Sequence, residues 1–125
     1  MAKPCHFLLA GLGLAILLSG CATPSRFEWG GYEPTLYAYA KKPDLRPSYR
    51  TALERAVDQG RKTNRLAPGL LAELGYLSLE DGDTSQAVRL FEEEMTAFPE
   101  SRVFLGGIVA RTKGQAVSKK AEASS

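Results

Sequence analysis

The fold is decided by residues 68–101, which read PGLLAELGYLSLEDGDTSQAVRLFEEEMTAFPES. Leucines recur at helical spacing in the first part of this segment, which predicts an amphipathic helix over residues 68–80. A second helix is predicted to begin behind Asp83, a residue that can cap it, and to end at Pro99. Two such helices joined by a tight, glycine-containing turn form an antiparallel helical hairpin.

Further helices are predicted on both sides of this hairpin. Upstream, a helix begins after Asp44, ends at Gly60 and places on one face Tyr49, Ala52, Leu53, Ala56 and Val57. Downstream, Ser101 is expected to cap a weaker helix that contains two adjacent glycines. The sequence therefore predicts an all-α domain over residues 27–113. Residues 114–125 have little apolar surface to bury and are expected to form a disordered tail.

An aromatic stretch precedes the helices, with Phe27, Trp29, Tyr32, Tyr37 and Tyr39 close together. Aromatic side chains bury large areas wherever they pack. Two interpretations are open: the rings close one end of the helical core, or they form a platform for a ligand. We favour the core interpretation.

The N-terminus is typical of an exported protein. Lys3 precedes an uncharged, mostly apolar run of 12 residues, Phe7–Leu18. A helix of this length spans about 18 Å, whereas the hydrocarbon core of a bilayer is about 30 Å thick. The run is therefore predicted to be a signal peptide, residues 1–20, and not a stable transmembrane span.

Leu18-Ser19-Gly20-Cys21 resembles a lipobox, the recognition signal of bacterial lipoproteins. The resemblance implies cleavage between Gly20 and Cys21 and attachment of diacylglycerol to the Cys21 thiol, so that residues 21–26 form a lipidated tether. It also implies three acyl chains, enough for stable membrane attachment. Ala22 after the cysteine resembles an outer-membrane sorting signal, with the protein facing the periplasm. The alternative is an ordinary signal peptide that leaves Cys21 free.

Charge and composition exclude several classes of function. The net charge is +2, and loss of the single charge of Lys3 with the signal peptide lowers it by one to +1, which does not indicate nucleic-acid binding. The only histidine, His6, and the other cysteine, Cys5, are lost with the same segment. We therefore expect no nucleophilic dyad, no zinc site and no cofactor. No phosphate-binding loop or other small-molecule site is evident.

Carboxylates remain as candidates for chemistry. Residues 92–94 are three consecutive glutamates, which point in directions about 100° apart on a helix and do not converge; most of this run is expected to be a solvated face. Glu73 is expected to pair with a base such as Arg55. We therefore predict that the protein is not an enzyme, and a carboxylate hydrolase is the least favoured alternative.

Residues 68–101 also resemble a tetratricopeptide repeat, a helical hairpin of about 34 residues. The matching positions are Leu74, Gly75, Gly82, Asp83, Ala87, Phe91 and Pro99, whereas Leu71, Ser78 and Glu94 depart from the usual pattern. The resemblance implies a short array of helical hairpins that binds a partner on the face lined by the first helix of the repeat. By this resemblance Tyr76, Leu79 and Glu80 are the candidate partner-binding residues. Alternatively, Tyr76 and Leu79 pack against the aromatic stretch.

Three longer strings resemble small bacterial lipoproteins of domain-of-unknown-function family 4810: WGGYE at 29–33, PGLLAELG at 68–75 and FPES at 98–101. Members of that family are typically encoded beside a lipoprotein that resembles the curli pore-former CsgG. The resemblance implies a lipid-anchored interaction module that assists assembly of another envelope lipoprotein, such as a CsgG-like one. A structural lipoprotein that contacts peptidoglycan, without a dedicated protein partner, is the alternative.

Overall fold

The structure is a computed structural model that describes residues 25–124. This part of the chain forms five α-helices, with a single 3-10 turn before α2 and another before α5. The helices are α1 (Tyr32–Lys41), α2 (Arg46–Thr63), α3 (Leu70–Glu80), α4 (Thr84–Ala97) and α5 (Arg102–Ala123). The predicted all-α class is confirmed.

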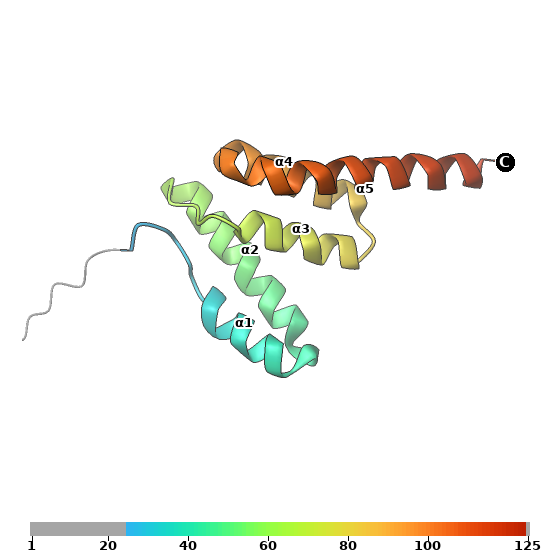
Figure 1. The fold of residues 1–125 in the computed structure, drawn as a ribbon. Coiled ribbons are helices and arrows are strands. Elements are labelled where there is room, and N and C mark those ends of the chain that lie inside the picture. The colour runs from blue at the N-terminus through green and yellow to red at the C-terminus, as the bar shows by residue number, and fades with distance from the viewer. Residues whose placement is uncertain (1–24, 125) are drawn as a thin grey trace, which may run out of the picture.

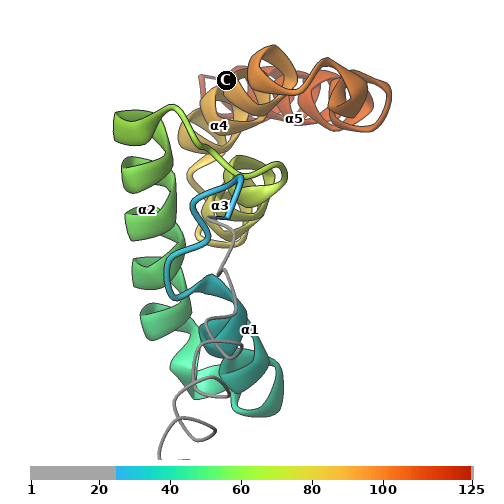
Figure 2. The same cartoon turned by 90° about the vertical axis from the view of Figure 1, so that its left-hand side faces the viewer.

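Each helix packs mainly against the helices that precede and follow it in the chain. In both Figure 1 and Figure 2, α3 lies between α1 and α2 on one side and α4 and α5 on the other. Two groups of buried side chains result. The first joins α2 and α3 and includes Tyr49, Leu53, Ala56, Val57, Leu70, Leu71, Leu74 and Leu77. The second joins α4 and α5 through Ala87, Phe91, Leu105 and Val109.

The aromatic stretch lies against the first of these groups as a chain of ring contacts. Ring centroids are 6.2 Å apart for Phe27 and Trp29, 6.0 Å for Trp29 and Tyr32, and 6.1 Å for Tyr32 and Tyr49. Tyr39 stacks on Tyr49 at 5.1 Å. The prediction that the aromatic residues close one end of the core is confirmed for these rings. The helical conformation of the part of this stretch that forms α1, which includes Tyr32 and Tyr39, is an addition to that prediction.

The predicted ends of α2 need correction. Asp44 does not cap the helix, because it lies in a 3-10 turn that precedes α2. Gly60 does not end it either: α2 continues to Thr63 and stops at Asn64, whose φ of 54° is left-handed. The helix passes Gly60 unbroken because the returning chain packs there, with the Arg65 amide donating to the Gly60 carbonyl at 2.9 Å.

Gly60 is expected to be intolerant of a larger side chain. A Cβ atom at this position would lie 2.7 Å from the Leu66 Cα atom, which is backbone and cannot turn aside. We therefore expect Gly60→Ala to lower the free energy of unfolding by about 1–3 kcal/mol. Gly114→Ala is the matched control, because nothing lies near that helical glycine, and it should raise stability by up to about 1 kcal/mol. Urea titrations of both variants test this, and an unchanged Gly60→Ala protein would contradict the close approach.

The hairpin of α3 and α4 agrees with the prediction. Gly82 takes a φ of 81° in the turn, and the Asp83 side chain accepts a hydrogen bond from the Gln86 amide at 2.9 Å. Gly75 permits the close packing of the two helices, because a Cβ atom there would lie 2.6 Å from the Phe91 ring.

The C-terminal helix is longer than predicted. Disorder was expected from Gly114 onward, but α5 extends to Ala123. Its last buried residue is Thr112, and the following residues are exposed. The prediction considered only the lack of apolar surface, whereas alanine, lysine, glutamine and glutamate are also strong helix formers that extend a helix already anchored by packing.

Candidate functional site

The three candidate partner-binding residues on α3 do not form one surface. Tyr76 is 37% exposed and its ring meets the Phe91 ring edge-on, with centroids 5.2 Å apart. Leu79 is partly buried and packs against the core shared by α4 and α5. Glu80 points toward α2, where it pairs with Arg46. Of the three, only Tyr76 combines an exposed side chain with no ion pair and no place in either core.

Tyr76 borders a groove of about 260 Å³, here called the α1–α3 groove. It is lined by Leu36 and Tyr39 of α1, Tyr49 of α2, and Glu73, Tyr76, Leu77 and Glu80 of α3. The charge of Arg111 on α5 opposes the rise that burial causes in the pKa of the Tyr76 hydroxyl. Side chains from α1, α2 and α3 therefore meet at the groove that Tyr76 borders.

Glu73 is the half-buried carboxylate of this groove. It does not pair with Arg55, as the sequence predicted; Arg55 borders a different hollow, with Gly31 and Thr35. The Tyr32 hydroxyl lies close enough to affect the pKa of the Glu73 carboxyl. Burial raises the pKa of this carboxyl, and the Tyr32 hydroxyl opposes the rise only in part. Glu73 is thus a partly desolvated carboxylate, and none of the ion pairs found among the described residues involves it.

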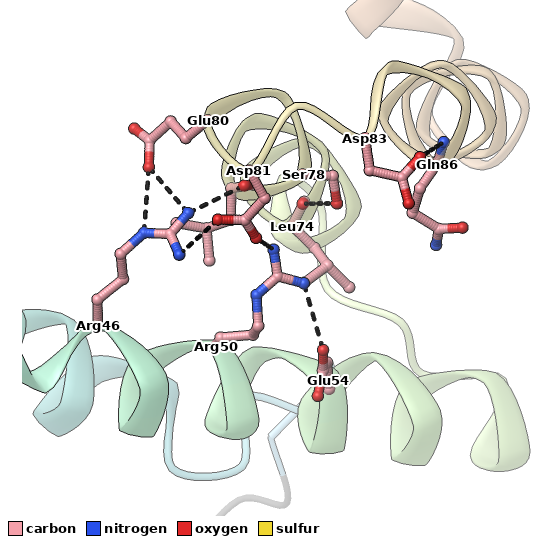
Figure 3. Close-up of polar contacts among 10 residues, drawn as sticks. Arg46, Arg50, Glu54, Leu74, Ser78, Glu80, Asp81, Asp83 and Gln86 are labelled. Carbon is pink, nitrogen blue, oxygen red and sulfur yellow. Dashed lines mark hydrogen bonds and ion pairs between the residues drawn. The ribbon is translucent and has the colours of Figure 1, made fainter.

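Glu80 belongs to a polar junction between α2 and the end of α3 (Figure 3). The Arg46 guanidinium donates to the Glu80 carboxylate at 3.1 Å and to the Leu77 carbonyl at 2.9 Å. It also pairs with Asp81 at 2.8 Å, and Arg50 reaches the other oxygen of the Asp81 carboxylate. These arginines compensate the carbonyl groups and the negative dipole at the C-terminus of α3. The role of Glu80 in this structure is therefore to join α2 to α3.

Glu94 is the residue whose role the sequence did not indicate. The expectation of a solvated face is correct for Glu92 and Glu93, which pair with Lys113 and Arg61 at the surface, but it is wrong for Glu94, which is 2% exposed. The Glu94 carboxylate accepts a hydrogen bond from the Gly69 amide at 2.7 Å and so caps the N-terminus of α3. Its spacing from Leu90 and Phe91 on the buried face was the available signal.

Burial raises the pKa of the Glu94 carboxyl, while the backbone amides at the start of α3, the Gly69 amide first, oppose the rise. One carboxylate oxygen accepts from the Gly69 amide, which lies at the helix N-terminus. The other oxygen, Oε2, is buried without a hydrogen-bond partner among residues 25–124. Glu94 is therefore a structural group with no solvent access, and it is not placed to act on a substrate.

The described residues hold no group of three or more His, Cys, Asp or Glu side chains arranged to bind a metal ion. Among the helices of residues 25–124, none is both long enough and apolar enough to cross a membrane. The predicted signal peptide, its cleavage site at Gly20 and the predicted lipidation site Cys21 lie outside the described residues.

Comparison with protein families gives one match. The model of the family described as Domain of unknown function (DUF4810) matches residues 27–108. The chain belongs to this family. The DUF4810 match covers α1 to α4 and the start of α5, so that Glu73, Tyr76 and Glu94 all lie inside it. No curated protein and no solved structure gives a significant match.

Proposed function

We propose that this DUF4810 protein is a lipid-anchored, non-catalytic module that faces the periplasm and binds another envelope protein. The observation that supports a binding role is the groove between α1 and α3, which is bordered by the exposed Tyr76. A groove bordered by an exposed aromatic residue is a common anchor point in protein interfaces. The observation that supports an anchor is the Leu18-Ser19-Gly20-Cys21 sequence.

We further propose that the domain is a short tetratricopeptide-like array. The packing of each helix on the next is the arrangement expected of repeat proteins. The α3–α4 hairpin has glycine, aromatic and proline residues in the register of one repeat. In such an array the first helices of successive hairpins line one face, and α1, α3 and α5 would be those helices.

The anchor is tested by removing the thiol. If Cys21 is acylated, Cys21→Ala should prevent lipid attachment and move essentially all of the protein from the outer-membrane fraction to the soluble periplasmic fraction. Fractionation of cells, with mass analysis of the mature N-terminus, measures this. Cys5→Ala is the matched control, because it lies in the segment that would be removed. A mutant that fractionates like the parent protein would refute the lipid anchor.

The binding face is tested by a pull-down from detergent extracts. The family resemblance makes a CsgG-like envelope lipoprotein the first partner to examine. Tyr76→Ala should reduce recovery of that lipoprotein by about tenfold or more, as expected when an anchor residue is lost. Tyr37→Ala is the control, because Tyr37 is 66% exposed and does not line the groove. Equal recovery by the parent and Tyr76→Ala proteins would place binding elsewhere.

A further inference from the structure

We propose that the α1–α3 groove receives a basic side chain, arginine or lysine, from the partner polypeptide, with Glu73 as its counter-ion. The inference rests on the proposed binding function and specifies the chemistry of the residue that enters the groove. It follows from three features of the described residues: the unequal pairing of the acidic groups, the arrangement of the rings, and the positions of the neighbouring arginines.

The acidic groups near the groove are not equally compensated. Glu80 and Asp81 pair with Arg46, and Arg50 also reaches Asp81. Glu73 lines the groove, and none of the ion pairs found among residues 25–124 involves it; the Tyr32 hydroxyl, which affects its pKa, is neutral. A half-buried carboxylate without a cation is unfavourable, and a cation that enters the groove would restore the lost stabilisation. Burial already raises the pKa of Glu73 in agreement with this unmet need.

The rings of the groove suit the same kind of ligand. Tyr76, which is 37% exposed, borders the groove from α3, and Tyr39 borders it from α1. The faces that Tyr39 and the buried Tyr49 turn toward each other are occupied by their stacking contact, so Tyr76 is the ring that offers an exposed surface to a cation. Aromatic faces attract ammonium and guanidinium groups, most strongly where water is excluded. Leu36 and Leu77 supply apolar surface for the methylene groups of a lysine or arginine side chain.

The neighbouring arginines leave Glu73 as the acidic group open to a cation. Arg46 is already held by the carboxylates of Glu80 and Asp81 and by the Leu77 carbonyl, and Arg111 is not among the residues that line the groove. An acidic side chain would face Glu73 directly, and an aliphatic one would leave it without a partner. Both are therefore selected against.

Short peptides test the inference on the full chain in neutral detergent. The probes are acetyl-Ala-Ala-Xaa-Ala-Ala-amides in which Xaa is arginine, lysine, citrulline or glutamate, with NMR chemical shifts of Glu73 and Tyr76 as the readout. Citrulline has the shape of arginine without its charge. We expect the arginine and lysine peptides to bind with a dissociation constant of about 1 mM and the citrulline and glutamate peptides at least about tenfold more weakly.

Variants complete the test. Glu73→Gln should weaken the arginine peptide about tenfold, a change of about 1.4 kcal/mol, and Glu73→Asp should retain part of the binding. Glu122→Gln, on the exposed end of α5, should leave binding unchanged. Glutamine has nearly the same size and shape as glutamate, so thermal unfolding should show a folded protein. If Glu73→Gln is unfolded, the arginine–citrulline comparison on the parent protein decides.

Equal binding of the arginine and citrulline peptides, or unchanged arginine binding in a folded Glu73→Gln protein, would overturn the inference. These outcomes differ from failure of the proposed function. If the envelope partner is lost with Tyr76→Ala but is retained with Glu73→Gln, the binding function is supported and the basic side chain is refuted.

Discussion

Replacing Phe91 by alanine is expected to lower the free energy of unfolding by about 3–5 kcal/mol, the usual cost of removing a buried phenylalanine. Phe91 is fully buried. Its ring fills the space that Gly75 leaves open between α3 and α4 and also contacts Tyr76. Small domains are stable by only about 5–15 kcal/mol. The variant should therefore unfold at a much lower urea concentration than the parent protein.

Urea unfolding followed by far-ultraviolet circular dichroism measures this loss. Phe104→Ala is the matched control, because Phe104 is 67% exposed on α5 and its replacement should change stability by no more than about 0.5 kcal/mol. Equal effects of the two substitutions would show that α3 and α4 are not held together by Phe91.

Glu94→Ala is the second substitution with a large expected effect. It removes the buried carboxylate that accepts a hydrogen bond from the Gly69 amide, and it leaves this amide at the start of α3 without a partner. We expect a loss of about 2–3 kcal/mol in the free energy of unfolding. Glu92→Ala removes an exposed glutamate that pairs with Lys113 and should cost no more than about 1 kcal/mol. Similar losses in the two variants would contradict the capping role.

The pH dependence of stability gives an independent check on Glu94. Its pKa in the folded protein is raised above the ordinary value of 4.5, chiefly by burial, so the folded state holds the proton more tightly than the unfolded state. This contribution to stability is present below pH 4.5 and is lost as pH rises through the folded pKa. The stability of the parent protein, relative to Glu94→Gln, should therefore fall with rising pH. If the stability of the parent protein relative to Glu94→Gln instead rises with pH, the folded state stabilises the ionised Glu94 carboxylate.

The parts of the fold that the sequence predicted are those with strong local signals. The buried face of α2, the Asp83 cap and the turn at Gly82 follow from spacing and turn chemistry, and the structure reproduces them. The all-α class follows from the same periodicity. The helical conformation of α1 had a weaker signal, the spacing of Tyr32, Leu36 and Tyr39 along one face, which the density of aromatic residues obscured.

The candidate site was predicted less well, because its residues are brought together by contacts between helices. Tyr76, a candidate partner-binding residue by the repeat resemblance, is exposed on α3. Neither the engagement of Glu80 by Arg46 nor the capping of α3 by Glu94 leaves a local pattern, since each joins residues far apart in the chain. The three glutamates therefore differ from expectation. Glu80 joins α2 to α3, Glu94 is buried, and Glu73 takes part in none of the ion pairs found among residues 25–124.

The packing of each helix on its neighbour in sequence has a consequence for how quickly the chain reaches its native state. Contacts between residues close in sequence require little loop closure, and domains with such topologies fold within microseconds to milliseconds. The search for the native arrangement can begin at the α3–α4 turn and spread outward in both directions. A polypeptide that condenses this fast exposes its apolar helix faces only briefly, which limits the time available for aggregation.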